Sequence, residues 1–518
     1  MRRLTRLLVL LAVAAACVPA AAAANPYPVT NTADSGEGSL RQAILAANSH
    51  MGLDSIPIDV IGTIGLETAL PTITDDVAIV GPGAGQVTVR REAALDFRIF
   101  DFAPTVTASL SGVTVANGRE QAGAGIRNGS GSLTLTGVVV TGNRAVTEGG
   151  EQAVVRAGGI LSSGPLTLRE SHIHDNLVVA SNGSKQTVAT GGGVETFGAL
   201  TVERSTVSDN HVEALGEGGQ QVVAKGGGLL VLGGPVAIRE STVSGNSILA
   251  AEGTSQNVAW GGGVQGSGVE LTGSTVTGNS IASDESALGA NLQHFATTVV
   301  RNSIVSRPLG DATSCNGLIA SGGFNIDEDG SCNFAGSGDQ EGVNPGLDPV
   351  LRANGGATPT HALFENSPAL DRGSAFGSAV DQRGLKRPVD LATVANAAGG
   401  DGADIGAFEA QGFPPPPPPA VVIIDLKPSD RVPPNTRITR GPARVTFKRL
   451  AKFWFTSTEA QSRFQCKVDN QPWRGCRSPA KRKVGPGKHV FRVRAIDGFG
   501  NVDPTPARFG WRVKKLGD

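Results

Sequence analysis

Hydrophobic and polar positions alternate in a block that recurs five times in the middle of the chain. The blocks span residues 133–143, 166–176, 200–210, 236–246 and 269–279, and each one ends in Asn. The first, third and eighth positions of every block are aliphatic, and one residue, usually Thr, separates the first two of them. An alternation of period two predicts a short strand with one buried face.

The spacing of the blocks predicts how these strands are stacked. The closing Asn recurs at intervals of 33, 34, 36 and 33 residues, and a variable polar stretch and a glycine cluster follow it. A short strand with a Gly and Asn turn cannot bury its own apolar face, so it must stack on copies of itself. The units are rich in Val, Thr, Ser and Gly, which favours strands over helical repeats. We therefore predict an all-β, right-handed parallel β-helix whose Asn side chains form a ladder.

The first 24 residues resemble a secretory signal peptide. Three arginines precede an apolar run over residues 7–16, and Ala22 and Ala24 mark a cleavage site before Asn25. Cys17 raises the alternative of a lipid anchor, which three preceding alanines disfavour. No later stretch is apolar enough to span a bilayer. We expect an extracellular protein, either secreted or associated with the cell surface, without a transmembrane span.

Four cysteines remain after the signal peptide, and they fall into two local pairs. Cys315 and Cys332 form one pair, and Cys466 and Cys476 form the other. An even number of cysteines in an exported chain predicts disulfides. Neither pair has the spacing of a zinc site with histidines nearby.

The order of segments predicts the domain organisation. An N-terminal capping segment (25–59) contains Ser39 and Gln42, which have the spacing of a capping box before a helix that should cover the open strand edges of the first coil. The parallel β-helix follows (60–310), and a turn-rich region (311–411) should finish it and seal its C-terminal end. A proline-rich linker (412–420) with six consecutive prolines then leads to a small β-sandwich (421–518).

The net charge of −1 conceals two unlike parts. Residues 420–518 contain 22 Lys and Arg against 7 Asp and Glu, a balance of +15, whereas residues 25–419 contain 20 against 39, a balance of −19. Clustered cations bind anionic polymers with a strong salt dependence. The densest basic run predicts contacts with anionic cell-wall or extracellular polysaccharide through Arg474, Arg477, Lys481, Arg482 and Lys483. The alternative is that the charge only keeps a small domain soluble.

Several motifs resemble known bacterial families. Residues 30–43 are similar to an N-terminal motif reading Cys-Ser-Leu-Arg-Glu-Ala in exported β-helix proteins, although Gly38 stands in place of Cys and Gln42 in place of Glu. Five motifs at 344–349, 354–361, 367–371, 381–384 and 404–409 together resemble the choice-of-anchor Q region. Residues 464–469, 489–497 and 500–507 are similar to a bacterial immunoglobulin-like module. The resemblance implies a secreted or cell-surface protein without a defined reaction. The pectate-lyase-like superfamily shares the fold, but fold alone does not imply activity.

Stacked charged residues are the first candidates for chemistry. Asp175 and Asp209 occupy equivalent positions of neighbouring units, as carboxylates that hold Ca²⁺ in a lyase would. The same column holds Gly142, Gly245 and Gly278, so a turn is the favoured interpretation. Arg and Glu alternate between coils near residues 169–170, 203–204 and 239–240, which predicts a salt-bridge ladder on the outer face.

The histidines and one acidic loop are weaker candidates. His172 and His174 flank a predicted core residue and should point outward together, as a metal pair or a general base would require. His361 is expected to pack at the helix end. Asn325, Asp327 and Asp329 have the spacing of the first half of a calcium loop, but Gly336 stands where the bidentate Glu would be. Calcium is therefore a candidate cofactor, and a disulfide-closed turn is favoured.

Aromatic residues are scarce in the regular coils. Between residues 105 and 300 only Phe197, Trp260 and Phe295 occur, and Trp260 is expected on a loop. Sugar-binding sites usually present aromatic faces. The sequence thus favours a non-catalytic protein for adhesion, envelope attachment or polysaccharide binding, with no catalytic residue assigned and no nucleic-acid partner. The alternative is a polysaccharide lyase or glycoside hydrolase of the pectate-lyase-like superfamily.

Overall fold

The structure is a computed structural model that describes residues 25–216, 221–254, 256–294, 296–310, 312–412, 432–459, 462–497 and 501–515. The predicted signal peptide and most of the predicted proline-rich linker lie outside these residues. The chain divides into two compact units, residues 1–413 and 414–518. The first unit is a right-handed parallel β-helix, as predicted, and the second is a small two-sheet domain.

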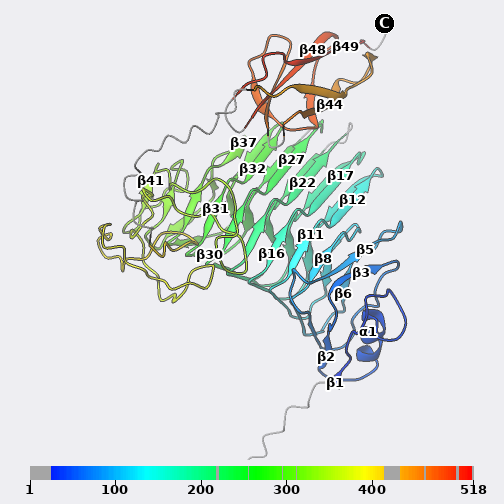
Figure 1. The fold of residues 1–518 in the computed structure, drawn as a ribbon, viewed down its shortest axis with the longest axis vertical. Helices are drawn as coiled ribbons and strands as arrows, with labels where there is room; N and C mark the ends of the chain where they lie inside the picture. Colours follow the sequence, from blue (N-terminus) through cyan, green and yellow to red (C-terminus); the bar gives the residue numbers. More distant parts are fainter. Residues whose placement is uncertain are drawn as a thin grey trace, which may run out of the picture. The chain divides into compact units, whose positions relative to one another are not determined.

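Three parallel sheets form the walls of the helix, because equivalent strands of successive coils pair with one another (Figure 1). Sheet 1 contains β1 (Asn25–Pro26), β2 (Asp54–Pro57), β4 (Val77–Val80), β7 (Ala108–Ser111), β10 (Leu133–Thr136), β15 (Leu166–Arg169), β20 (Leu200–Glu203), β25 (Val236–Arg239), β30 (Val269–Thr272), β35 (Thr298–Arg301) and β39 (Ile319–Ser321). Sheet 2 contains β3 (Gly62–Leu66), β5 (Val87–Arg91), β8 (Thr114–Ala116), β11 (Val139–Thr141), β16 (His172–His174), β21 (Thr206–Ser208), β26 (Thr242–Ser244), β31 (Thr275–Thr277), β36 (Ile304–Ser306), β40 (Ile326–Asp327) and β41 (Gln340–Glu341). Sheet 3 contains β6 (Phe100–Phe102), β9 (Ile126–Asn128), β14 (Ile160–Ser162), β19 (Val194–Thr196), β24 (Leu229–Val231), β29 (Val264–Gly266), β34 (Leu292–His294) and β38 (Cys315–Asn316).

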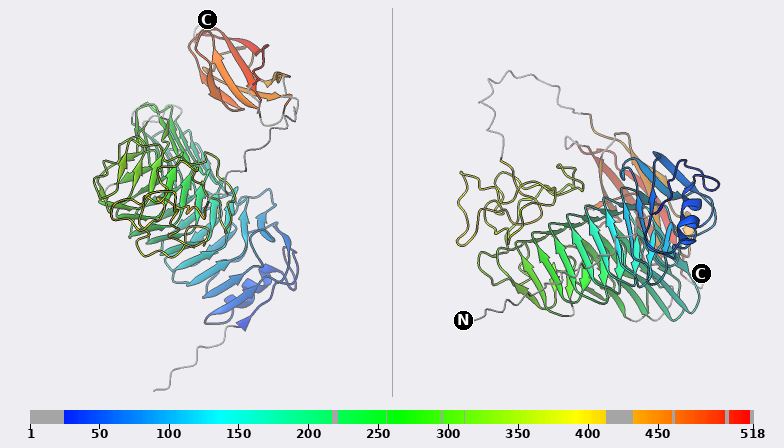
Figure 2. Two further views of the ribbon diagram at one scale, coloured as in Figure 1. Left: turned by 60° about the vertical axis from the view of Figure 1, so that its left-hand side comes forward. Right: turned by 90° about the horizontal axis from the view of Figure 1, so that it is seen from below.

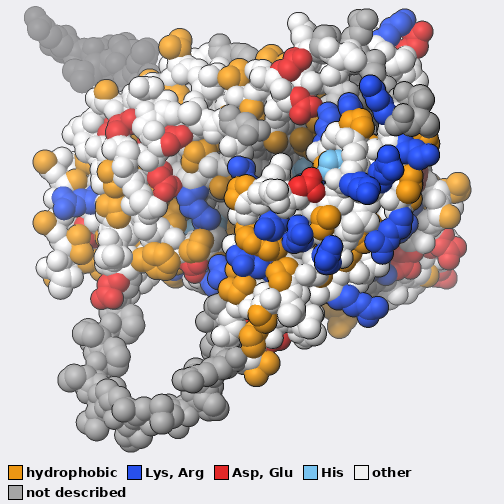
Figure 3. Space-filling view, turned by 90° about the horizontal axis from the view of Figure 1, so that it is seen from above, with side chains coloured by type: hydrophobic (Ala, Val, Ile, Leu, Met, Phe, Trp, Pro, Cys, Tyr) orange, Lys and Arg blue, Asp and Glu red, His pale blue; other side chains and the backbone are white. Residues whose placement is uncertain are grey.

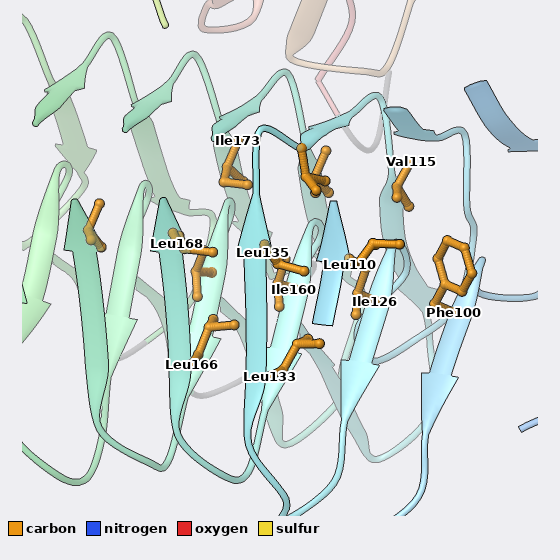
Figure 4. Close-up of a cluster of buried hydrophobic side chains, with 14 of the residues drawn as sticks. Phe100, Leu110, Val115, Ile126, Leu133, Leu135, Ile160, Leu166, Leu168 and Ile173 are labelled. Atoms are coloured by element: carbon orange, nitrogen blue, oxygen red, sulfur yellow. The ribbon is translucent and has the colours of Figure 1, made fainter. Parts of the chain in front are cut away.

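The predicted aliphatic columns fill the interior of these walls. Leu133 pairs in register with Leu166, and Val140 pairs with Ile173, so like side chains stack from coil to coil. Figure 4 shows these columns lying side by side inside the helix. Burial of each side chain depends on the coils above and below, which is why the repeat predicted the fold.

The column of Asn residues forms the predicted ladder. Asn176 Nδ2 donates to Asn210 Oδ1 at 2.9 Å, and Asn210 Nδ2 donates to Asn246 Oδ1 at 2.9 Å. The same amides also donate to main-chain carbonyls of the preceding coil, such as that of Ile173 at 2.9 Å. The polar backbone groups of the buried turn between sheet 2 and the next strand therefore form hydrogen bonds with side chains.

The variable polar stretch that follows each Asn forms a pair of strands. The outgoing strands are β12 (Arg144–Glu148), β17 (Leu177–Ser181), β22 (His211–Leu215), β27 (Ser247–Ala251), β32 (Ser280–Ser283) and β37 (Leu309–Gly310). The returning strands are β13 (Gln152–Arg156), β18 (Gln186–Thr190), β23 (Gln221–Lys225), β28 (Asn257–Trp260) and β33 (Ser286–Leu288). The two sheets pack face to face through a core of Ala, Val and Ile side chains that includes Ala145, Ala180 and Ala224, and together they form a two-layered ridge. Alanine side chains at these alternating positions let the two layers approach closely.

The N-terminal end of the helix is covered as predicted. Helix α1 (Leu40–Asn48) buries Leu40 and Ile44 in the core of the first coils. One half of the predicted capping box forms, because Ser39 Oγ accepts from Gln42 N at 3.3 Å, whereas Gln42 Oε1 accepts from the N–H of Gly38, before the N-cap, at 2.8 Å. Gly38 has a φ of 74°, and a Cβ there would lie 2.2 Å from Thr30 Oγ1, which accounts for Gly at this position.

The C-terminal end of the helix is closed by a disulfide loop. Cys315 and Cys332 are bonded and lie with Phe334 in the buried core of the last coils. The rest of the region that was expected to seal this end, residues 343–412, instead lies along the outer face of sheet 2 (Figure 2). Thr242 Oγ1 donates to Gln382 Oε1 at 2.6 Å, and Ala407 N donates to Thr275 Oγ1 at 3.0 Å. The small hydroxyl side chains of sheet 2 are thus contacts for this segment.

The second unit contains two sheets that enclose an aromatic core. One sheet is antiparallel and contains β42 (Thr436–Arg440), β44 (Leu450–Ser457) and β47 (Ala480–Lys483). The other contains β43 (Val445–Thr446), β49 (Ala507–Val513), β48 (Gly487–Ile496), β45 (Arg463–Val468) and β46 (Arg474–Cys476). The rings of Phe453 and Phe491, one from each sheet, stack at 4.0 Å. The predicted disulfide between Cys466 and Cys476 joins the neighbouring strands β45 and β46.

Candidate functional site

Charged and aromatic side chains meet where the ridge returns to sheet 3. The residue that directly follows each returning strand has a positive φ. This residue is Gly191 in one coil (68°) and Gly226 in the next (62°). This turn brings two outward-facing side chains together. One belongs to the last residue of the returning strand, and the other belongs to the sheet 3 strand that follows. Thr190 Oγ1 accordingly donates to Glu195 Oε2 at 2.6 Å. We name the set Arg156, Glu195, Phe197, Lys225 and Trp260 the glycine corner.

Two side chains of the glycine corner have pKa values that differ from their usual ones. Glu195 is fully buried although it faces outward, and this burial raises the pKa of its carboxyl group. Arg156 Nη1 lies 3.3 Å from Glu195 Oε1 and opposes this shift. Burial also lowers the pKa of Lys225, which sits one coil further along. Oppositely shifted acid and base groups side by side are typical of functional sites.

The described aromatic side chains of the regular coils lie at this corner too. Lys225 Nζ lies 4.6 Å from the centroid of the Trp260 ring, and Arg156 Cζ lies 5.6 Å from that of Phe197. Trp260 is the last residue of β28, so its predicted place on a loop was wrong. The ridge strands, whose outward positions carry these residues, were not recognised in the sequence.

Asp175 and Asp209 lie at the opposite edge of the ridge, in a shallow pocket of about 300 Å³. Arg144 and His211 also line it. Asp175 and Asp209 have φ of 53° and 54°, and Gly142 in the same column has 65°. The left-handed conformation explains why Asp and Gly alternate in this column, and it confirms that these are turn positions.

The predicted salt-bridge ladder is confirmed on the outer face of the helix. Arg204 Nη2 lies 2.8 Å from Glu170 Oε1, and Arg204 Nη1 lies 2.8 Å from Glu203 Oε1. Arg169 Nε lies 3.3 Å from Glu203 Oε2, and Arg239 continues the series with Glu270 in the next coil. These arginines therefore neutralise carboxylates of neighbouring coils.

The histidines lie on the outer face of sheet 2. The rings of His172 and His174 stack at 4.0 Å, and burial lowers the pKa of His172 to about 3. His174 Nδ1 lies 2.8 Å from Asp175 Oδ2. His361 is buried, and its Nε2 lies 2.7 Å from Ser244 Oγ, so it packs the 343–412 segment against the side of the helix rather than its end.

The three residues considered for calcium binding form hydrogen bonds with other groups of the chain. Asn325 Nδ2 donates to the carbonyl of Val300 at 3.0 Å. Asp327 Oδ2 accepts from Cys332 N at 2.7 Å, and Asp329 Oδ2 accepts from Ser314 N at 2.8 Å. These bonds fit the disulfide-closed turn. No cluster of three or more His, Cys, Asp or Glu that could hold a metal occurs in the described residues.

The five predicted polyanion contacts are divided between two sheets and the segment that joins them. Lys481 and Lys483 alternate with Arg482 along β47, and Arg482 shares a side with the buried Ala480. Burial lowers the pKa of Arg482. Arg474 and Arg477 are exposed at and beyond β46, on the other side of the disulfide. Their role in binding stays a prediction.

No protein-family model and no curated protein matches the chain. Solved structures that resemble it include pectate lyase Pel9A, with 15% identity and a TM-score of 0.35 over 75% of this chain and 97% of that one. Another is the catalytic unit of a thermostable GH87 α-1,3-glucanase from Streptomyces thermodiastaticus strain HF3-3, with 16% identity and a TM-score of 0.22 over 59% and 69%. Both resemblances concern the architecture, and nothing about the chemistry of this chain follows from them. Within the described residues, no helix is long and apolar enough to cross a membrane.

Proposed function

We propose that this protein is exported to the cell surface or the medium and binds a polysaccharide along the glycine corner without cleaving it. The observation that carries the proposal is the grouping of Trp260, Phe197 and the charged side chains at one edge of successive coils. The signal-like N-terminus and the resemblance of residues 344–409 to a choice-of-anchor Q region support export and surface location.

The arrangement suits an extended polymer that runs along the helix axis. Equivalent residues of neighbouring coils are about 4.8 Å apart, so successive contacts repeat at a short, regular interval. The ring of Phe197 is 42% exposed, and aromatic faces of this kind stack on the apolar faces of sugar rings. Charged groups beside the rings can form hydrogen bonds with hydroxyl or carboxylate groups of the same sugar.

Binding by the full chain to a panel of neutral and uronate polysaccharides tests the proposal. Trp260→Ala should weaken binding of the recognised polysaccharide about fivefold to thirtyfold, because a stacked ring is worth roughly 1–2 kcal/mol. Phe364→Ala is the matched control, since Phe364 is an aromatic residue that is 48% exposed elsewhere in the first unit. Equal affinities of the wild type and the Trp260 variant would contradict this site.

A second candidate function is that of a polysaccharide lyase or glycoside hydrolase. It is favoured by the shifted pKa values of the side chains at the same glycine corner. A raised pKa favours the protonated form of Glu195, which can donate a proton, and a lowered pKa favours the neutral amine of Lys225, which can accept one. In a lyase, the Lys225 amine would accept the proton next to a uronate carboxyl group, and Glu195 would protonate the leaving oxygen. Release of an unsaturated product with Ca²⁺ present, and its loss in both Lys225→Met and Glu195→Gln, would replace the binding proposal with this one.

A further inference from the structure

The five-stranded sheet of the second unit has one face that is rich in cations. In β48 the residues Phe491, Val493 and Ala495 point into the buried core, so the residues between them face outward. The same alternation in β45 and β49 places further basic residues on that side. The cationic face consists of Arg463, Lys467, Lys488, Arg492, Arg494, Arg508 and Arg512. The gathering of Lys and Arg side chains can be seen in Figure 3.

Like charges lie directly opposite one another in the register of this sheet. Lys467 pairs with Arg492, Arg492 pairs with Arg508, and Lys488 pairs with Arg512. Such pairs destabilise a sheet, and within the described residues none of the seven is paired with a carboxylate. Their nearest polar partners are neutral, as when Arg494 Nη2 donates to Gln465 Oε1 at 2.7 Å. The repulsion costs stability, and an anion bound at this face would relieve it.

An aromatic ring lies at the edge of the same face. Lys467 Nζ is 4.9 Å and Arg494 Cζ is 4.5 Å from the centroid of the Trp473 ring. The side chain of Trp473 is only partly buried, so part of it remains accessible. A ring that is held between two cations can stack on a sugar while the cations bind its acidic groups.

We propose that the cationic face is a docking surface for a carboxylated polysaccharide. Five of the seven cations are Arg, whose planar guanidinium binds a carboxylate through two parallel hydrogen bonds. Neighbouring cations are about 5–7 Å apart across and along the strands, within one Debye length, so they act on a polymer as one field. The surface belongs to the second unit and is separate from the glycine corner.

The geometry favours a polysaccharide over a nucleic acid. Proteins that bind single strands stack successive bases on several aromatic side chains, and here the described face has one ring at its edge. The major groove of duplex DNA admits a helix or a narrow two-stranded ribbon, whereas this face is a broad sheet. A chain of acidic sugars needs spaced cations and one stacking platform.

Two variants with the same change in net charge test the proposal. The first carries Arg492→Gln, Arg494→Gln and Arg508→Gln. The second carries Arg474→Gln, Arg477→Gln and Lys483→Gln, which lie outside the cationic face. Both are made in the full chain with Trp260→Ala, so that the glycine corner contributes less and equally to both. Binding to polygalacturonate, dextran and a single-stranded oligonucleotide is measured from about 50 mM to about 1 M salt, where the Debye length falls to about 3 Å.

Polygalacturonate should bind the Trp260→Ala protein at low salt and dissociate at high salt, while dextran should not bind. The first variant should lose about tenfold or more in affinity at low salt, and the second less than about threefold. Equal losses would show that only net charge matters, and a larger loss in the second would move the site to the other residues; either result overturns the proposal. Oligonucleotide binding as tight as that of polygalacturonate would overturn the choice of partner.

A folding defect cannot imitate the expected result. The first variant removes like-charge contacts, so its unfolding temperature should equal or exceed that of the parent. Trp473→Ala is a further test that leaves the charges intact, and it should lower the affinity for polygalacturonate about threefold to tenfold. Unchanged affinity in this variant would remove the ring from the site and overturn the stacking argument.

Discussion

The Asn ladder makes a sharp prediction, because each amide holds two coils together. Asn210 Nδ2 donates to the carbonyl of Ile173 at 2.9 Å and to Asn246 Oδ1 at 2.9 Å. Its Oδ1 accepts from the backbone N of Asn176 at 3.1 Å and from Asn176 Nδ2 at 2.9 Å. Asn210→Ala removes all four bonds in the middle of the stack, at a fully buried position.

The magnitude follows from the four bonds. Each contributes about 1 kcal/mol net, and the backbone N–H of Asn176, left buried without this acceptor, costs about 1–3 kcal/mol more. The free energy of unfolding should therefore fall by about 5–7 kcal/mol. Because each coil contacts only its neighbours, the weakened junction should also broaden the transition or split it in two. Denaturant unfolding followed by circular dichroism measures both effects.

Thr201→Ala is the matched control for this experiment. Thr201 lies one strand earlier in the same coil, at an outward position of β20, and its replacement should change stability by less than about 0.5 kcal/mol. If the free energy of unfolding falls by less than about 1 kcal/mol in Asn210→Ala, the reasoning is refuted. Water would then form hydrogen bonds with the polar groups of the turn as well as the Asn ladder does.

Two further predictions concern pH and the second unit. Burial lowers the pKa of His172 to about 3, below its value of 6.5 in the unfolded chain, so the stabilisation present above pH 6.5 should be lost as the pH falls towards 3. The wild type should therefore lose more stability than His172→Gln across that range, and parallel pH profiles of the unfolding temperature would contradict the burial of the ring. Replacing Cys466 and Cys476 by Ala opens a loop with a sequence separation of 10, which should cost the second unit about 2–3 kcal/mol in calorimetry; an unchanged transition would show that the disulfide does not constrain the unfolded chain.

The walls of the helix could be predicted because their pattern is repeated without gaps. Positions such as Leu133 and Leu166 are buried by their copies, so the same residue type is required in each coil. The ridge could not be predicted, because the turns between its outgoing and returning strands vary in length and part of its core consists of small residues such as Ala145. A column of alanines lacks the strong alternation that marks a strand of Val or Leu.

The candidate sites were missed for a different physical reason. A run of adjacent charges in the sequence, Lys481 to Lys483, is divided by strand alternation between two sides of a sheet. The cationic face brings together Lys467, Arg492 and Arg508, which are far apart in the chain and become neighbours only through strand register. Register depends on which faces are buried and on the turns, and a single sequence does not state it.

The fold separates the residues that build it from those that can carry specificity. At the glycine corner, the turn residue with positive φ allows the chain to fold back so that an outward side chain of the ridge meets one of sheet 3. The outward sheet 3 position holds Leu161, Glu195 and Leu230 in successive coils, while the inward position before it stays aliphatic. Exchange at the outward position leaves the interior columns untouched. Glu195 and Leu230 are buried, however, so the groups that a polymer can reach are at the last position of the returning strands, where Arg156, Lys225 and Trp260 are partly exposed. We therefore expect binding specificity of this protein to depend on the order of side chains along this corner rather than on any single coil.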